Sequence, residues 1–196
     1  VVSSAMSGVT NDLIKKSKNL SKDFEPAELD VLVSSGEQMA CALIAGRLKY
    51  LGYKSRSWMA WQVPILTEGN YSSAKIKEIK KNNIKKYLKL GGIPVVTGFQ
   101  GLNENHRITT LGRGGSDASA IMIAKFFKAE KCVIYTDVIG IMTTDPRIYK
   151  KAKKIKTISY EEMLEMASSG SKVMQSSSVQ DARLNRIDID VKSSFI

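Results

Sequence analysis

Apolar residues along this chain fall into short runs and longer amphipathic segments that alternate with one another. The short runs are rich in Val and Ile and have the length of strands that are buried on both faces. They predict strands at residues 1–4, 93–99, 131–138 and 187–194.

Segments with helical periodicity separate these runs. Residues 34–52 predict a helix that Gly52 ends, with an inward face made of Ala40, Leu43, Ile44, Leu48 and Leu51. An almost wholly apolar helix is expected at 117–130, and another near 178–186. Ser159 and Glu162 have the spacing of a capping box, and Thr10 or Asn11 is a candidate N-cap after the first strand.

The order of these elements predicts the fold class. Strands that alternate with helices favour an α/β domain with a largely parallel sheet covered by helices. The chain has 196 residues, which suffice for one such domain. No internal repeat, low-complexity segment or linker interrupts it.

The net charge of +11 is concentrated in two segments. Residues 71–90 carry seven lysines and one glutamate, and residues 147–156 carry six basic residues and no acid. We interpret the first as a solvated helix face with Ile84, Tyr87 and Leu88 inward, and both as surfaces that attract anionic substrates. Nucleic-acid binding is a distant alternative, because only tyrosines at 71, 87 and 149 could interleave with the basic residues.

The cysteine and histidine content limits the kinds of functional site that the chain can form. Cys41 and Cys132 lie in separate apolar runs, which favours two buried free thiols and a reducing, cytoplasmic setting. His106 is the only histidine, so a zinc site or a histidine-based nucleophilic triad is not expected. No apolar run is long enough to span a membrane, so no membrane partner is expected either.

The stretch TTLGRGGSDASA, residues 109–120, predicts an anion site. Gly112, Gly114 and Gly115 allow backbone amides to approach a ligand, and the following helix start favours negative charge. The Arg113 guanidinium suits bidentate binding of a carboxylate or phosphate. Asp117 cannot hold an anion itself, so we expect it to orient cationic side chains or to cap the helix. A plain glycine-rich turn with a helix cap remains the alternative.

Three other segments are ambiguous by themselves. Residues 135–147 follow a predicted buried strand, where nucleotide loops of α/β sheets lie, and end in an Asp145–Pro146 turn. Glu37 follows Ser34 at capping-box spacing, so the bare pattern favours a cap over a ligand. Lys172 follows a glycine at a predicted helix end, where a lysine is usually a surface residue.

Taken in order, these segments carry a family resemblance that covers nearly the whole chain. The motifs are SSAMSGVTN, SSGEQ, TGFQG, ITTLGRGGSDASA, YTDVIGIMTTDPR, ISYEEMLEMASSGSKV and the terminal VKSSF. The set resembles the catalytic domain of aspartokinases, which belong to the amino acid kinase family. The GRGGSD and TDPR stretches are the most specific, because relatives that act on glutamate, acetylglutamate or UMP share the fold but not this set.

The resemblance implies a three-layer α-β-α sandwich that transfers the γ-phosphoryl group of ATP, with Mg²⁺, to the side-chain carboxylate of L-aspartate. The product would be 4-phospho-L-aspartate, at the entry to lysine, diaminopimelate, threonine and methionine. A cytoplasmic enzyme and a homo-oligomeric parent are expected.

The resemblance also assigns site residues. Substrate binding falls on Thr10, Glu37, Arg113, Gly114 and Ser116. Arg113 suits the α-carboxylate of aspartate, and Glu37 suits its ammonium group. Asp117 matches the organiser of catalytic lysines, and Lys172 lies near the transferred phosphoryl group. The nucleotide side comprises Ser4, Thr136, Asp137, Met142, Arg147 and Lys172.

The chain departs from the family pattern at several points. Residues 1–196 are expected to form a catalytic domain without the first strand, its K-[FY]-G-G-[ST]-S loop, and the C-terminal regulatory domains. Ile139 replaces a common acidic residue, Met142 a frequent tyrosine and Ser177 a usual arginine. These departures leave two alternatives open: a non-catalytic nucleotide-binding subunit or fragment, and an amino acid kinase with another acceptor.

Overall fold

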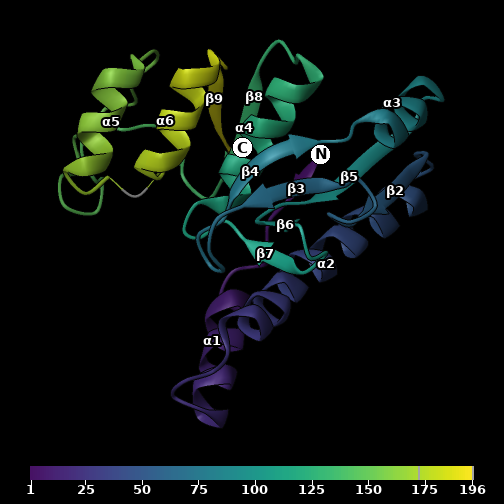
Figure 1. Ribbon diagram of the computed structural model, residues 1–196. Helices are drawn as coiled ribbons and strands as arrows, with labels where there is room; N and C mark the ends of the chain where they lie inside the picture. The colour runs from purple at the N-terminus through teal and green to yellow at the C-terminus, as the bar shows by residue number, and fades with distance from the viewer. Residues whose placement is uncertain (172, 196) are drawn as a thin grey trace. The chain divides into compact units, whose positions relative to one another are not determined.

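The computed structural model describes residues 1–171 and 173–195, which form two compact units, Val1–Ala120 and Ile121–Ile196 (Figure 1). Unit 1 contains, in order, β1 (Val2–Ser3), α1 (Val9–Leu20), α2 (Pro26–Tyr50), β2 (Ser55–Trp58), β3 (Ile65–Glu68), β4 (Lys75–Ile79), α3 (Asn82–Lys89), β5 (Ile93–Thr97), β6 (Gln100–Leu102) and β7 (Ile108–Thr110). Helix α4 (Gly115–Phe127) begins in unit 1 and ends in unit 2. Unit 2 continues with β8 (Cys132–Thr136), α5 (Tyr160–Ser168), α6 (Ser176–Asn185) and β9 (Ile189–Ser193).

A parallel sheet forms the centre of unit 1. Its strand order is β1-β5-β2, with both outer strands parallel to β5. Helix α2 runs along all three strands, and α3 packs against β5 (Figure 1). Because β5 (IPVVT) is almost entirely buried, it can be apolar throughout, as the sequence predicts.

The contact between α2 and this sheet is made by small side chains. Cys41, Ala45 and Val95 form a buried cluster, with Leu48 and Met59 packed against it. The predicted inward face was therefore partly wrong: Leu43 is 57% exposed and Leu51 is 52% exposed. Small residues allow the helix backbone to lie close to the sheet, and the larger apolar side chains beside them face solvent. Cys41 and Cys132 are both buried and not joined in a disulfide, as predicted.

A second sheet of unit 1, in the order β4-β3-β6-β7, was not predicted. Only its β3–β6 pair is parallel. Its edge strand β4 (KIKEI) comes from the lysine-rich segment that we interpreted as one helix face. Its isoleucines, Ile76 and Ile79, are three residues apart, a spacing that fits a helix face, and only the following segment forms α3. In α3, Ile84 is buried as predicted, whereas Leu88 is 46% exposed.

Unit 2 contains a two-stranded parallel sheet, β8-β9, and the helix pair α5 and α6. Ser159 and Glu162 form the predicted capping box of α5. The α/β class and its parallel sheets agree with the prediction. No helix in the described part of the chain is long and apolar enough to cross a membrane.

Candidate functional site

The segment that follows β1 brings together side chains from three distant parts of unit 1. The Ala5 amide donates to Oε1 of Glu37 on α2, 3.1 Å away. One residue earlier, the hydroxyls of Ser4 and Ser116 lie 3.2 Å apart. Predicted site residues from the end of β1, the middle of α2 and the start of α4 therefore meet at residues 4–5.

Glu37 is a buried carboxylate, not a helix cap. It lies in the middle of α2, which begins at Pro26, so the capping-box interpretation of Ser34 and Glu37 was wrong. Its side chain is 3% exposed. Oε2 is buried and has no hydrogen-bond partner in the described structure. Burial raises the pKa of Glu37 to about 6, against the opposing effect of the Ala5 hydrogen bond.

A buried carboxylate oxygen without a donor is costly, so it needs a partner such as a water molecule, an ion or a ligand. A cationic ligand at Oε2 would supply the missing charge and the missing hydrogen bond. Glu37 can therefore bind an ammonium group.

The glycine-rich loop begins directly after β7. Gly112 and Gly114 both have positive φ angles, 75° and 73°, which disfavour any side chain at these positions. The Gly115 amide donates to the Gly112 carbonyl across 3.0 Å, which closes a turn around Arg113. The Arg113 side chain is exposed, so its guanidinium is available to an anion in solution.

The start of α4 is fixed by the segment after β5. The Phe99 amide donates to the Ser119 hydroxyl across 2.9 Å. A Cβ at Gly98 would lie 2.9 Å from the Ser3 carbonyl and 3.2 Å from Cα of Ser116. Gly98 thus lets the end of β1 and the start of α4 approach each other. This places Ser116 at the carboxyl end of parallel strands, where ligands of α/β sheets bind.

Asp117 and Thr10 lie in the first turns of two helices. Asp117 is in the first turn of α4, and burial raises the pKa of its carboxyl group above the ordinary value. Thr10 is inside α1 and does not cap it, because the helix begins at Val9 after Gly8 in the left-handed conformation. The predicted cap at Thr10 or Asn11 was therefore wrong.

The residues predicted for the nucleotide, Ser4 apart, belong to unit 2. Thr136 ends β8, and its hydroxyl donates to the exposed Asp137 carboxylate across 3.1 Å. Met142 forms an isolated antiparallel bridge with Lys154. Arg147 is held by Asp145 at 2.7 Å, and this pairing raises the pKa of the guanidinium. Lys172 lies outside the described residues.

Potential metal ligands are not clustered in the part of the chain that the structure describes. Within the described ranges, no group of three or more His, Cys, Asp or Glu side chains could hold a metal ion. His106 lies in the turn between β6 and β7, with φ of 56°.

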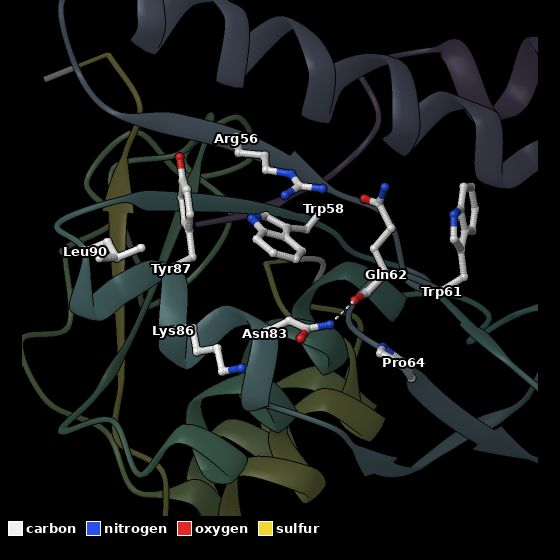
Figure 2. A pocket seen from close by; sticks show the side chains of 9 residues that line it. All are labelled: Arg56, Trp58, Trp61, Gln62, Pro64, Asn83, Lys86, Tyr87 and Leu90. Atoms are coloured by element: carbon white, nitrogen blue, oxygen red, sulfur yellow. Dashed lines mark hydrogen bonds between the residues drawn. The ribbon is translucent and has the colours of Figure 1, made fainter.

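Figure 2 shows a groove of unit 1 with the side chains that line it. This groove has a volume of ≈ 570 Å³ and is lined mainly by side chains from β2, the turn after it and α3. The Arg56 guanidinium lies 4.3 Å from the centroid of the Trp58 ring, and Trp58 meets Tyr87 edge to face. None of the predicted site residues in the described structure lines the groove, so it is not the site predicted from the sequence.

Comparison with known proteins adds to this geometry. The family model described as the amino acid kinase family matches residues 1–193. An aspartokinase of Rickettsia felis is 48% identical over all of this chain, which covers 49% of that protein. The chain thus spans about half the length of the curated relatives it matches.

Solved structures agree. Aspartate kinase from Synechocystis has a TM-score of 0.85 and 40% identity, covering 100% of this chain and 32% of that one. E. coli aspartokinase III in complex with aspartate and ADP has a TM-score of 0.81 and 31% identity. That match covers 94% of this chain and 43% of the other.

Proposed function

The chain belongs to the amino acid kinase family, and we propose that it is the catalytic part of an aspartokinase, which phosphorylates the side-chain carboxylate of L-aspartate with ATP. The observation that carries the proposal is Glu37. Its buried Oε2 has no partner among the described residues and would be stabilised by a cation. The ammonium group of a free amino acid is such a cation. Acceptors without an ammonium group, such as acetylglutamate or UMP, would leave that oxygen unpaired.

The exposed Arg113 complements Glu37. We assign its guanidinium to the α-carboxylate of aspartate, since a planar fork binds a carboxylate through two parallel hydrogen bonds. Thr10, Gly114 and Ser116 would complete the substrate side. With both ends of the amino acid held, the side-chain carboxylate is left to react. The aspartate and ADP bound in the structure of E. coli aspartokinase III support this choice of substrates.

The reaction requires little from the protein beyond alignment and charge neutralisation. A carboxylate oxygen of aspartate forms a bond to the γ-phosphorus while the bond between that phosphorus and the ADP oxygen breaks, which gives an acyl phosphate and ADP. Because the carboxylate is already a nucleophile, no general base is needed. Catalysis then rests on positioning and on stabilising the charge of the phosphoryl oxygens.

Lys172 and Asp117 take the catalytic roles in this proposal. Lys172 would neutralise the transferred phosphoryl group, and Asp117 would hold the cationic side chains in place. Ser4, Thr136, Asp137, Met142 and Arg147 would contact the nucleotide. Since the described residues contain no cluster of metal ligands, Mg²⁺ would arrive with the phosphates of ATP, where it supplies positive charge.

The proposal extends to the setting of the reaction. The product would be 4-phospho-L-aspartate, which leads to lysine, diaminopimelate, threonine and methionine. We further propose a cytoplasmic location and a homo-oligomeric protein, of which residues 1–196 form the catalytic domain.

The test is ADP release from MgATP, measured with and without L-aspartate, with hydroxylamine present to trap the acyl phosphate as a hydroxamate. Aspartate-dependent release that disappears in Asp117→Ala supports the proposal. Equal release with glutamate, acetylglutamate or UMP would instead identify another acceptor. ATP binding without any aspartate-dependent release would indicate a non-catalytic nucleotide-binding subunit.

A further inference from the structure

Asp30 is a carboxylate buried inside unit 1 that none of the roles above uses. It lies on α2, two turns before Glu37, and is 0% exposed. Each of its oxygens accepts two hydrogen bonds, and the donors come from the loop of residues 69–74 and from the end of β7. From Ser72 it accepts the amide at 2.9 Å and the hydroxyl at 2.8 Å. From Thr110 it accepts the amide at 2.7 Å and the hydroxyl at 2.8 Å.

The two segments that Asp30 joins also contact each other. The Ala74 amide donates to the Thr110 carbonyl across 3.0 Å. A Cβ at Gly112 would lie only 3.0 Å from the Ser72 carbonyl. Ser72 itself has a φ of 62°, an uncommon value for a residue with a side chain. The loop of residues 69–74 is therefore held against the glycine-rich loop, with Asp30 bonded to both.

The position of Arg113 depends on this arrangement. Thr110 is the last residue of β7, and Arg113 follows three residues later in a turn with two left-handed glycines. Such a turn is flexible in isolation, because glycine has the most backbone freedom to lose. An exposed arginine binds an anion well only where its backbone is already placed, since ordering it on binding would cost affinity.

Burying a carboxylate is costly unless it is fully hydrogen-bonded, and Asp30 meets that condition with four donors. We propose that Asp30 is a positioning residue, which fixes the loop that carries Arg113 for binding of the substrate carboxylate. This inference rests on the proposed function for the identity of the substrate. It concerns how the site is organised rather than which residues touch the ligand.

The test is Asp30→Asn, which keeps the shape but replaces one acceptor oxygen with a donor group. The amide cannot accept all four hydrogen bonds, so buried donors are left unpaired. We expect the KM for aspartate to rise at least tenfold while the KM for ATP changes less than twofold. A purely structural role would lower the amount of active protein and leave both KM values unchanged.

The matched control is Glu28→Gln, two residues earlier on the same helix. Glu28 pairs with Arg107 on the strand hairpin that contains β7, but at the protein surface. Its loss should leave the KM for aspartate within twofold. Should Asp30→Asn not fold, Ser72→Ala removes one of the four hydrogen bonds and should raise the same KM about threefold.

Hydrogen exchange separates this inference from the proposed function. In Asp30→Asn, the amides of residues 110–116 should exchange at least tenfold faster than in the wild type, and in Glu28→Gln they should not. If the wild-type protein neither binds nor phosphorylates aspartate, the proposed function fails, and the exchange data still decide whether Asp30 holds the loop. Unchanged exchange in 110–116, or an unchanged KM for aspartate in an active Asp30→Asn enzyme, overturns the inference.

Discussion

The Ala5 amide and the Glu37 carboxylate are 3.1 Å apart, so the segment after β1 is fixed to the middle of α2. The hydrogen bond occupies Oε1 and leaves Oε2 buried without a partner in the described structure. Glu37 is thus half satisfied, in a place where burial raises its pKa to about 6. A carboxyl group that titrates near neutral pH gives two measurable consequences.

The first concerns stability without ligand. The pKa of Glu37 is raised in the folded state from 4.5 to about 6, so the folded state binds more protons than the unfolded state within that window. Its contribution to the free energy of unfolding therefore falls as pH rises from 4.5 to 6, by up to about 2 kcal/mol. Urea denaturation of the wild type and of Glu37→Gln at several pH values measures this pH-dependent contribution of Glu37. A difference between the two proteins that does not change across the window would contradict the shifted pKa.

The second concerns binding. An ammonium group beside Glu37 favours the carboxylate and lowers its pKa, so aspartate binding should release about half a proton at pH 6 and up to about one proton at lower pH. Affinity for aspartate should fall about tenfold per pH unit below 6. Calorimetry in two buffers of different ionisation enthalpy measures the released protons. Glu37→Gln should bind weakly and release none. Equal proton release by the variant would place the titrating group elsewhere.

Glu37 also shows where local sequence patterns fail to predict a site residue. Its spacing from Ser34 indicated a cap, because a four-residue pattern cannot show that α2 already began at Pro26. Only the family resemblance predicted it as a ligand, and its hydrogen bond to Ala5, 32 positions away, could not be predicted locally. Asp30 was missed for the same reason, since its partners Ser72 and Thr110 lie 42 and 80 positions away in the sequence.

Local signals were reliable where the interactions themselves are local. The Ser159–Glu162 capping box and the apolar strand β5 both form as predicted. The lysine-rich segment was harder, because charged residues on an edge strand and on a helix are equally solvated. The spacing of Ile76 and Ile79 fits a helix, yet both lie on β4, where Ile79 is buried.

Arg113 gives a prediction about specificity. If its guanidinium binds the α-carboxylate, Arg113→Ala should raise the KM for aspartate by roughly 10- to 100-fold, the worth of a charge-assisted hydrogen bond. β-Alanine has the ammonium group and the reacting carboxylate but no α-carboxylate. The variant should therefore lose most of the preference for aspartate over β-alanine, as measured by kcat/KM. Because Arg113 is exposed, the melting temperature of Arg113→Ala should match that of the wild type. A preference that survives intact would assign the α-carboxylate to another residue.

Lys172 gives a prediction about turnover. Loss of one preorganised donor to a charged transition state costs about two to three powers of ten in kcat. We expect Lys172→Ala to lose that much, with the KM for aspartate changed less than threefold. Steady-state kinetics measure kcat and the KM for aspartate, and circular dichroism shows whether the variant is folded. A loss under threefold in a folded protein removes Lys172 from the catalytic role.

Two glycines in unit 1 give a matched test of how the start of α4 is positioned. A methyl group at Gly98 would meet backbone atoms of Ser3 at 2.9 Å and Ser116 at 3.2 Å, which cannot move as a flexible side chain does. Gly98→Ala should therefore lower the free energy of unfolding by about 1–3 kcal/mol and weaken ligand binding by displacing Ser116. A methyl group at Gly46, within α2, would meet nothing within 4 Å. Gly46→Ala should raise the free energy of unfolding by about 0.5–1 kcal/mol and leave binding unchanged. If urea denaturation shows a lower free energy of unfolding for Gly98→Ala and a higher one for Gly46→Ala, the close approach of β1 and α4 at Gly98 is supported. If both substitutions raise the free energy of unfolding, the two elements have room to separate.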